Sequence, residues 1–387
     1  MKIWYLHQYF RTPEEGGATR SYTLAQGLAQ AGHQVHVVTA HNQTEYLRRQ
    51  ISPHLVVHYL PVAYRQAMGM ATRGKAFTGY VRAVLQWAAQ QSATPDGIYA
   101  TSTPLTVGYL AYRLHRRYQI PYVFEVRDLW PDVPFQLAPA LRLMSPGLRY
   151  WERRIYRHAR GIVALSPPMA TAIQKRTQTP TTVIPNFADR TLFRPEAPGP
   201  AWRERWQVPE GKLCIAYTGS IGLANAPSTL VAAVVASPTV HWVILGEGSH
   251  WAAVKAALLD APNVSFHPFD TKAEVADLLN SADAAWVSFL EKPQVLGTNS
   301  PNKFFEALAS GCAVLTNRPG WYTDLIEDAG AGTGVTPEGL PVLLQQWAEN
   351  PQRLKENQSA ARTLSEQFDA NLLTQKWLAW VLPHFKG

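Results

Sequence analysis

The chain has little charge and almost no cysteine. Charged residues make up 17% of its 387 residues, against 46% hydrophobic ones, and this balance argues against a disordered protein. The two cysteines, Cys214 and Cys312, both lie in apolar, strand-like segments. We therefore expect two buried free thiols, which suits the reducing environment of the cytoplasm.

Long apolar runs and metal-binding patterns are also missing. No apolar run approaches the roughly 18–20 residues that cross a bilayer. Residues 1–7 read as a strand, because no apolar core or cleavage site of a signal peptide follows them. There is no Asp-x-Asp motif and no His/Cys cluster with metal-ligand spacing. We expect no metal ion or other cofactor.

The order of the segments predicts an α/β protein with two domains. Short apolar strands alternate with amphipathic helices, which is typical of parallel sheets, and 387 residues exceed one ordinary core. A proline-rich run up to Pro200 separates two Rossmann-like halves. We assign 1–186 to the first domain and 187–369 to the second. In folds of this type the last helix crosses back, so 370–387 joins the first domain.

Strands are expected at 2–6, 34–39, 97–100, 122–126, 161–165, 182–184, 213–217, 241–245, 264–266, 284–288 and 313–316. The clearest helices are expected at 21–31, 74–90, 106–117, 147–158 and 372–381.

Positive charge is concentrated in the first half. Residues 1–186 hold 21 Lys and Arg against 8 Asp and Glu, and the remainder holds 15 against 20. A solvated basic face is the plain alternative, and no nucleic-acid motif accompanies the charge. An anionic membrane surface or a lipid-pyrophosphate acceptor fits better, since each cation near such a surface adds about 1 kcal/mol. Aromatics expected to be exposed, such as Tyr80 and Trp87, would support peripheral attachment.

The helix that ends at Gly311 carries the clearest functional signal. Ser300 suits its N-cap and Pro301 its first position. A helix N-terminus binds phosphate, Lys303 adds a point charge, and Glu306 can accept hydrogen bonds from ribose hydroxyls. The alternative is an ordinary buried helix with one surface Lys and one Glu. The pattern favours a site for a nucleotide-sugar diphosphate.

This segment resembles the donor-site helix of family-four retaining glycosyltransferases, and the resemblance extends over almost the whole chain. It implies a GT-B architecture, in which two Rossmann-like domains face each other across a cleft with the donor on the second and the acceptor on the first. The donor-binding residues that it implies are Gly17, Gly219, Ser220, Gly246, Pro268, Phe269, Thr298, Asn299, Ser300, Asn302, Lys303 and Glu306.

Several glycine-containing loops fit this family, although each is also compatible with a plain turn. Gly17 follows Gly16 before the first helix, without the spacing of the dinucleotide fingerprint, which disfavours NAD. Gly219 permits close approach of the backbone, and Gly246 lies in a Gly-acid-Gly turn. The segment around Phe269 resembles the one that cradles the base through its main chain.

Two departures from the family concern the diphosphate and the sugar. No Lys or Arg occurs between 212 and 255, so Lys303, Arg11, Arg20 or backbone amides must hold the diphosphate. The first Glu of the family's Glu-x7-Glu pattern is replaced by Thr298. The hydroxyl of Thr298 and the backbone amides of Asn299 and Ser300 would then contact the sugar.

A second motif, Glu-Val-Arg-Asp-Leu-Trp-Pro-Asp, follows the strand at 122–126. Ligands bind beyond the carboxyl ends of such strands, and four ionisable groups would be costly in a core. Structural pairing of Arg127 with an acid is the plain alternative. The motif resembles a WbuB-like subgroup of bacterial surface-polysaccharide transferases. This implies that Asp128 orients the acceptor hydroxyl or the donor sugar, and that Arg127 contacts phosphate or fixes Asp128. With Lys303, these form the expected catalytic set. The acceptor-side candidates are Arg11, Arg20, Glu125 and Trp130.

The implied reaction is retaining transfer from a UDP-sugar, expected to be an N-acetylated hexosamine or deoxyhexosamine. The acceptor would be lipid-linked or a saccharide, in O-antigen or capsule synthesis, and the enzyme cytoplasmic or peripheral at the inner membrane face. Helix N-termini and cations would stabilise the departing diphosphate. Two alternatives remain open: a non-hydrolysing UDP-sugar epimerase, and a catalytically silent nucleotide-binding partner subunit of the same fold.

Overall fold

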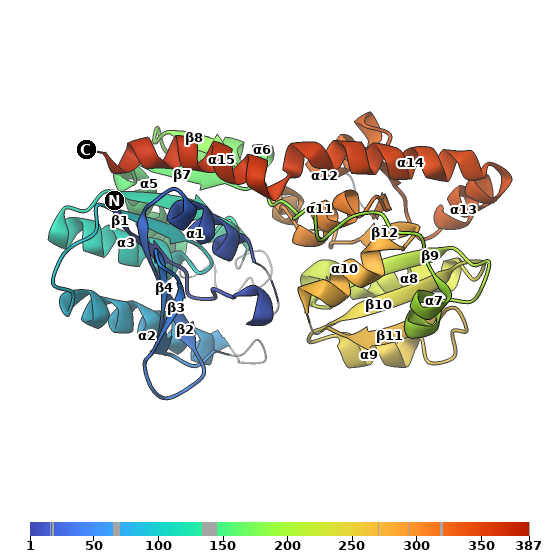
Figure 1. The fold of residues 1–387 in the computed structure, drawn as a ribbon, viewed down its shortest axis with the longest axis horizontal. Coiled ribbons are helices and arrows are strands. Elements are labelled where there is room, and N and C mark those ends of the chain that lie inside the picture. The colour runs from blue at the N-terminus through green and yellow to red at the C-terminus, as the bar shows by residue number, and fades with distance from the viewer. Residues whose placement is uncertain are drawn as a thin grey trace. The chain divides into compact units, whose positions relative to one another are not determined.

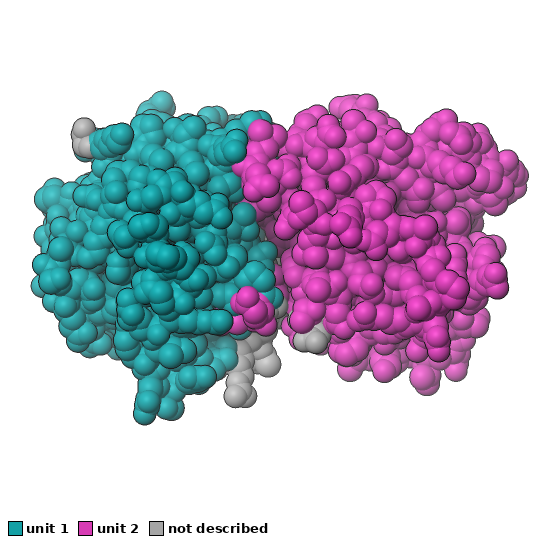
Figure 2. Space-filling view, in the orientation of Figure 1, with its two compact units in different colours: residues 1–13, 18–185, 373–387 teal, residues 14–17, 186–372 magenta. Residues whose placement is uncertain are grey.

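The computed structural model describes residues 1–15, 17, 19–64, 70–133, 145–269, 271–292, 294–317 and 320–386. The chain divides into two compact units, which Figure 2 shows in different colours. The first comprises Met1–Pro13, Ala18–Pro185 and Leu373–Gly387, and the second comprises Glu14–Gly17 and Asn186–Leu372. Both are α/β units built around a largely parallel sheet.

The first unit contains, among its described residues, an eight-stranded sheet with the order β3-β4-β2-β1-β5-β6-β7-β8. Its strands are β1 (Lys2–Leu6), β2 (Gln34–His41), β3 (Leu47–Ser52), β4 (Leu55–Pro61), β5 (Gly97–Thr101), β6 (Tyr122–Val126), β7 (Gly161–Ala164) and β8 (Thr181–Val183). All neighbours pair in parallel except β3 and β4. Strands β5 and β6 are buried along their whole length, as expected where helices cover both faces of a parallel sheet.

Helices surround this sheet, as Figure 1 shows. They are α1 (Arg20–Gln30), α2 (Met70–Ala89), α3 (Leu105–Tyr118), α5 (Ser145–His158), α6 (Pro167–Gln174) and α15 (Ala370–Val381), with the short 3-10 turn η6 (Leu382–Phe385). The 3-10 turn η1 (Pro13–Glu15) has its first residue in the first unit and the other two in the second. Tyr80 and Trp87 of α2 are buried, at 0% and 5% exposed, so the prediction that they are exposed aromatics is wrong. Their side chains fill the core, because an amphipathic helix turns its large apolar residues toward the sheet.

The end of the chain packs against the first unit. The ring of Trp377 in α15 lies 4.9 Å from that of Tyr99 in β5. The glycines beneath this segment make the contact possible: a Cβ on Gly97 would lie 2.4 Å from the Phe385 ring. The last residues therefore cover the sheet of the first unit through close glycine–aromatic contacts.

The second unit has a six-stranded parallel sheet in its described part, with the order β11-β10-β9-β12-β13-β14. The strands are β9 (Cys214–Ser220), β10 (His241–Glu247), β11 (Val264–Pro268), β12 (Ala284–Val287), β13 (Ala313–Thr316) and β14 (Gly332–Gly334). The helices are α7 (Pro200–Trp206), α8 (Pro227–Ala236), α9 (Trp251–Ala257), α10 (Lys272–Asn280), α11 (Asn302–Ala309), α12 (Trp321–Asp328), α13 (Leu340–Glu349) and α14 (Pro351–Leu364). Short 3-10 turns are η3 (Leu223–Asn225), η4 (Gln294–Thr298) and η5 (Ser365–Phe368).

Both cysteines lie in this second unit, at the start of β9 and just before β13. Cys214 and Cys312 are buried and free, which confirms the expectation from the sequence. Burial raises the pKa of both thiols, so they remain protonated and act as small apolar side chains. Along the described stretches of both units, no helix combines the length and the apolar character that a membrane span needs.

Candidate active site

The N-terminus of α11 has a different cap from the one that the sequence predicts. The helix begins at Asn302, and its N-cap is Pro301, whose backbone is extended. Ser300 is not the cap: its hydroxyl accepts a hydrogen bond from the Asn186 amide at 3.0 Å, and its carbonyl accepts one from the Asn186 side chain. The predicted N-cap and first helical position are therefore wrong by one residue. No side chain caps the first N–H groups of α11, which suits an anion.

Lys303, in the first turn of α11, carries a buried amine. Its Nζ lies 4.1 Å from the ring centroid of Tyr217 and 5.7 Å from that of Phe289. It has no hydrogen-bond partner among the described residues. Burial lowers the pKa of Lys303 to about 7. A buried amine without an acceptor is costly, so this arrangement is suited to an anionic ligand.

Glu306, one turn further along α11, is 4% exposed and forms an ion pair with Lys272. Lys272 is the first residue of α10, and sequence reasoning missed it. The two residues are 34 positions apart, so no local pattern in the sequence links them. The pair engages Oε1 of the carboxylate, and among the described residues Oε2 receives no hydrogen bond.

The loop before α11 presents two polar side chains. The hydroxyl of Thr298 donates to the carbonyl of Val295 at 2.7 Å. The carbonyl of Asn299 accepts from the indole of Trp321 at 2.8 Å, while its side-chain oxygen is buried with no partner in the part of the chain that is described. The Asn186 side-chain oxygen is in the same situation. Unsatisfied polar atoms therefore gather at the loop that leads into α11.

The carboxyl end of β9 lies close to α11, because the Tyr217 ring of β9 lies 4.1 Å from the Lys303 amine. Gly219 adopts a φ of +103°, which favours glycine, and the space beside it is open. Ser220 is exposed, and its carbonyl accepts from the Tyr217 hydroxyl at 2.8 Å. The carboxyl end of β9 is therefore placed to meet a ligand at the start of α11.

Gly246 and Phe269 have structural partners. A Cβ on Gly246 would lie 2.3 Å from the Gly219 carbonyl oxygen, so a glycine is needed there for β9 and β10 to approach. The amide of Phe269 donates to the Gly246 carbonyl at 3.2 Å, and Pro268 has no N–H to offer. Main-chain recognition of a base at Pro268 and Phe269 would therefore depend on carbonyl groups, and it stays a prediction.

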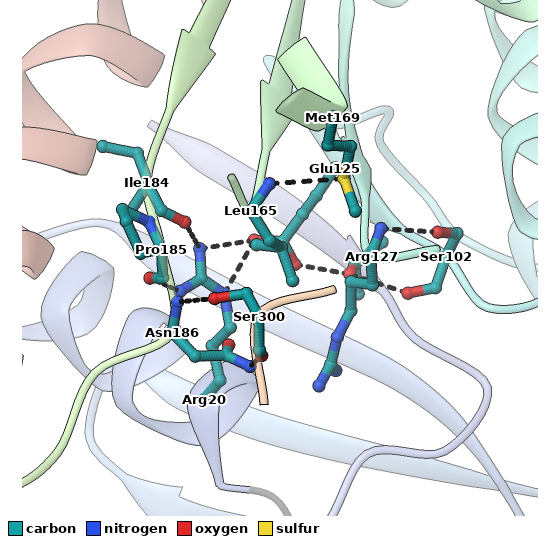
Figure 3. Close-up of polar contacts among 11 residues, drawn as sticks. Arg20, Ser102, Glu125, Arg127, Leu165, Met169, Ile184, Pro185, Asn186 and Ser300 are labelled. Carbon is teal, nitrogen blue, oxygen red and sulfur yellow. Dashed lines mark hydrogen bonds and ion pairs between the residues drawn. The ribbon is translucent and has the colours of Figure 1, made fainter. Parts of the chain in front are cut away.

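In the first unit, Arg20 and Glu125 form a buried ion pair, drawn in Figure 3. They are 3% and 0% exposed. Arg20 also donates to the carbonyls of Ile184 at 2.9 Å and Pro185 at 2.5 Å, and the Thr101 hydroxyl donates to Glu125 at 2.5 Å. Burial alone would raise the pKa of Glu125, but Arg20 and Arg127 hold it below its usual range. Arg20 and Glu125 thus join the sheet to the segment after β8, and their contact with an acceptor stays a prediction.

Arg127 and Asp128 lie beyond the end of β6. The amide of Arg127 donates to the hydroxyl of Ser102 at 2.9 Å, a contact visible in Figure 3. Burial raises the pKa of Asp128, and the charge of Arg127 opposes that rise. A carboxyl group whose pKa is shifted by burial, at the end of a parallel strand, is a candidate for contact with a ligand.

His7, which sequence reasoning missed, follows β1 at the same edge of the sheet. Its Nδ1 is buried without a partner in the described residues. Burial and the charge of Arg127 lower the pKa of His7 well below its usual value, so the imidazole is neutral. Strands β1, β5 and β6 are neighbours, and they bring His7, Ser102 and Arg127 together. Ligands bind beyond the carboxyl ends of parallel strands, and this rule could have identified His7 from the sequence, because His7 directly follows the first strand.

The other predicted residues of the first unit are more scattered. Asp132, at the end of the motif, forms ion pairs with Arg149 and Arg176, which also bind Glu152. The ring of Trp130 lies 6.3 Å from that of Phe77. Arg11 is exposed. The motif thus divides its ionisable groups: Glu125 and Asp132 are engaged in ion pairs, whereas Arg127 and Asp128 lie beyond the strand end, where a ligand can bind.

Gly17 has a φ of +90°, a conformation that favours glycine, and Gly16 lies outside the described residues. Within the described ranges, no three His, Cys, Asp or Glu side chains are grouped as a metal site requires.

Comparisons with known proteins agree with this fold. Residues 15–192 match the model of Glycosyltransferase Family 4, and residues 215–357 match that of Glycosyl transferases group 1. A comparison with curated protein sequences gives no match.

Several solved structures share the fold over nearly their whole length. Sucrose-phosphate synthase from Thermosynechococcus elongatus has a TM-score of 0.80 at 16% identity, covering 97% of each chain. WaaG, a glycosyltransferase of lipopolysaccharide biosynthesis, has a TM-score of 0.71 at 17% identity, covering 99% of this chain and 100% of its own. HepE from Anabaena, solved with UDP-glucose, has a TM-score of 0.68 at 18% identity, covering 97% and 98%.

These findings show a fold of the GT-B type, and each half of the chain matches a glycosyltransferase family model. The predicted fold class is confirmed. The N-terminal half matches the family-four model, and the WbuB-like subgroup stays a prediction.

Proposed function

We propose that this protein is a glycosyltransferase that moves a sugar from a UDP-sugar, with retention of the anomeric configuration, to a lipid-linked or saccharide acceptor. The observation that carries this proposal is the buried Lys303 amine, without a hydrogen-bond partner among the described residues, in the first turn of α11. The Anabaena protein of the same fold was solved with UDP-glucose and with UDP and glucose, which supports UDP as the nucleotide.

The donor diphosphate would lie at the uncapped N–H groups of α11, including that of Asn302, beside the Lys303 amine. These groups would stabilise the negative charge that develops on the leaving diphosphate. Such electrostatic stabilisation is the largest single contribution to the rate enhancement of many enzymes. Glu306 would accept hydrogen bonds from the ribose through its second oxygen. Thr298 and Asn299 would contact the sugar.

On the acceptor side, the proposal uses Arg127 and Asp128. Asp128 would accept a hydrogen bond from the attacking hydroxyl and orient it, and the neutral His7 would add a second polar contact. In a retaining transfer without a covalent intermediate, the acceptor proton leaves on the departing diphosphate. The role of Asp128 is therefore orientation.

The basic surface of α3 and α5 supports an acceptor at a membrane. Its exposed arginines are Arg113, Arg116, Arg117, Arg153 and Arg157, and Tyr150 of α5 is 50% exposed. Such a surface attracts anionic lipid, so we propose peripheral attachment at the inner face of the cytoplasmic membrane. With the WbuB-like motif, this favours O-antigen or capsule synthesis with an N-acetylated hexosamine or deoxyhexosamine donor.

The test is an assay of nucleotide release over a panel of UDP-, GDP- and dTDP-sugars, with and without membrane-lipid extract as acceptor. We expect release from one UDP-sugar that depends on acceptor, loss of release in Lys303→Met, and an α- or β-linkage by NMR that matches the donor. Isomerisation of a UDP-sugar without acceptor would instead show an epimerase. Binding without turnover on any acceptor fraction would show a silent partner subunit.

A further inference from the structure

An expected ion pair within α11 is not formed. Lys303 and Glu306 lie three residues apart on one helix, a spacing at which a cation and a carboxylate readily meet. The structure instead pairs Glu306 with Lys272 of α10 and leaves the Lys303 amine over the Tyr217 and Phe289 rings. The partner of Glu306 is thus a distant residue, although a local one is available.

The surroundings of Lys272 keep its side chain beside Glu306. It follows Thr271, the N-cap of α10, whose hydroxyl accepts from the Glu274 amide at 3.3 Å. The Lys272 side chain is 15% exposed, and its amine lies 5.9 Å from the Phe193 ring centroid. A pair that is largely removed from water is screened little by salt, so the attraction of Lys272 for Glu306 is strong.

This pairing matters for the neighbouring anion site. A lone carboxylate at Glu306 would draw the Lys303 amine toward itself, and its negative charge would repel a diphosphate. Lys272 neutralises that carboxylate and occupies Oε1. The Lys303 amine then keeps its capacity for an external anion, and the second Glu306 oxygen stays available for a hydroxyl donor.

We propose that Lys272 is a positioning residue for the donor: by holding Glu306, it keeps the Lys303 amine unpaired for the diphosphate and aims the carboxylate at the ribose. This inference rests on the proposed function, since it concerns the same donor site. A purely architectural role, in which Lys272 merely joins α10 to α11, is the competing explanation.

The two explanations differ in two affinity ratios. The ratio of UDP to uridine affinity reports the diphosphate contacts, and the ratio of UDP to 2′-deoxy-UDP affinity reports the ribose contact. Isothermal titration would give both ratios for the full-length wild type, Lys272→Met, Glu306→Gln and the double variant. Lys272→Arg is the conservative rescue. Lys212→Met is the control, because Lys212 is an exposed lysine of the same unit whose amine donates only to the Thr239 carbonyl among the described residues.

In Lys272→Met we expect the UDP-to-uridine ratio to fall about 10- to 100-fold, because Glu306 captures the Lys303 amine and a charge-assisted contact is lost. The ribose ratio should fall toward one. In the double variant the neutral glutamine side chain that replaces Glu306 cannot capture Lys303, so the diphosphate ratio should return to within about threefold of Glu306→Gln alone, while the ribose discrimination stays lost. Lys272→Arg should keep both ratios.

Three results would overturn the inference. One is a Lys272→Met variant that retains both ratios. Another is a double variant in which the diphosphate ratio does not recover, and the third is an equal weakening of all ligands together with a lower melting temperature, as an architectural role predicts. A wild type that binds no UDP would refute the proposed donor and this inference with it, so the two failures are distinguishable.

Discussion

Binding of UDP should take up a proton, because the Lys303 amine is buried in the free protein. Burial lowers its pKa to about 7, from the 10.5 of an exposed lysine. At pH 8 only about one Lys303 in ten is then protonated. A diphosphate beside the amine favours the charged form and raises the pKa of Lys303 again, so each binding event at pH 8 should take up close to one proton.

The same linkage sets the pH dependence of affinity. Below pH 7 the amine is already charged and Lys303 contributes no dependence. Above pH 7 the affinity for UDP should fall by up to about tenfold for each pH unit, until the pH reaches the pKa of the bound state. The terminal phosphate of UDP does not add to the pH dependence above pH 7, since its second ionisation lies near pH 6.

Titration of UDP at pH 8 in buffers of different ionisation enthalpy measures the uptake directly. We expect about 0.9 proton for the wild type and Lys212→Met, and none for Lys303→Met, which should also bind more weakly. An uptake near zero in the wild type would refute the lowered pKa of Lys303, and an equal uptake in Lys303→Met would refute the assignment of Lys303 to the diphosphate.

Three further predictions concern stability. Arg20→Met leaves Glu125 buried without its cation and should destabilise the first unit by about 3–5 kcal/mol, whereas pairing it with Glu125→Leu should cost less; chemical denaturation of both variants checks this. Gly97→Ala forces a methyl group against the Phe385 ring and should cost about 1–3 kcal/mol, with earlier proteolytic release of the chain end. Because the folded-state pKa of Lys303 is depressed, the unfolded state binds more protons between pH 7 and 10, so unfolding free energy should rise with pH there in the wild type and less in Lys303→Met.

Much of the fold follows from local pattern. The bounds of β1, β6 and β13 agree with prediction, because each is a short apolar run between turn or loop residues. Strand β3 was missed because Leu47–Ser52 is an edge strand whose side chains are largely exposed and include two arginines. Strand β14 was missed because Gly332–Gly334 has two glycines in three residues, which no strand pattern favours.

The candidate site depends on contacts between distant segments, which the local sequence pattern does not predict. The run from Ser300 to Glu306 predicts a donor helix, and in the structure the Lys303 amine of that helix is buried without a hydrogen-bond partner among the described residues. The sequence could not show that Lys272 pairs with Glu306, nor that Arg20 pairs with Glu125. Both are contacts between distant segments, and the choice among several nearby charges depends on burial and geometry that only the folded chain provides.

A crystal structure of the protein with UDP tests the central claim most directly. We expect the diphosphate at the N-terminus of α11, with an oxygen within hydrogen-bond distance of Lys303 Nζ, and a ribose hydroxyl on Glu306 while Lys272 stays paired with it. A nucleotide bound elsewhere on the chain, or one whose phosphates do not contact Lys303, would contradict the claim that α11 forms the donor site.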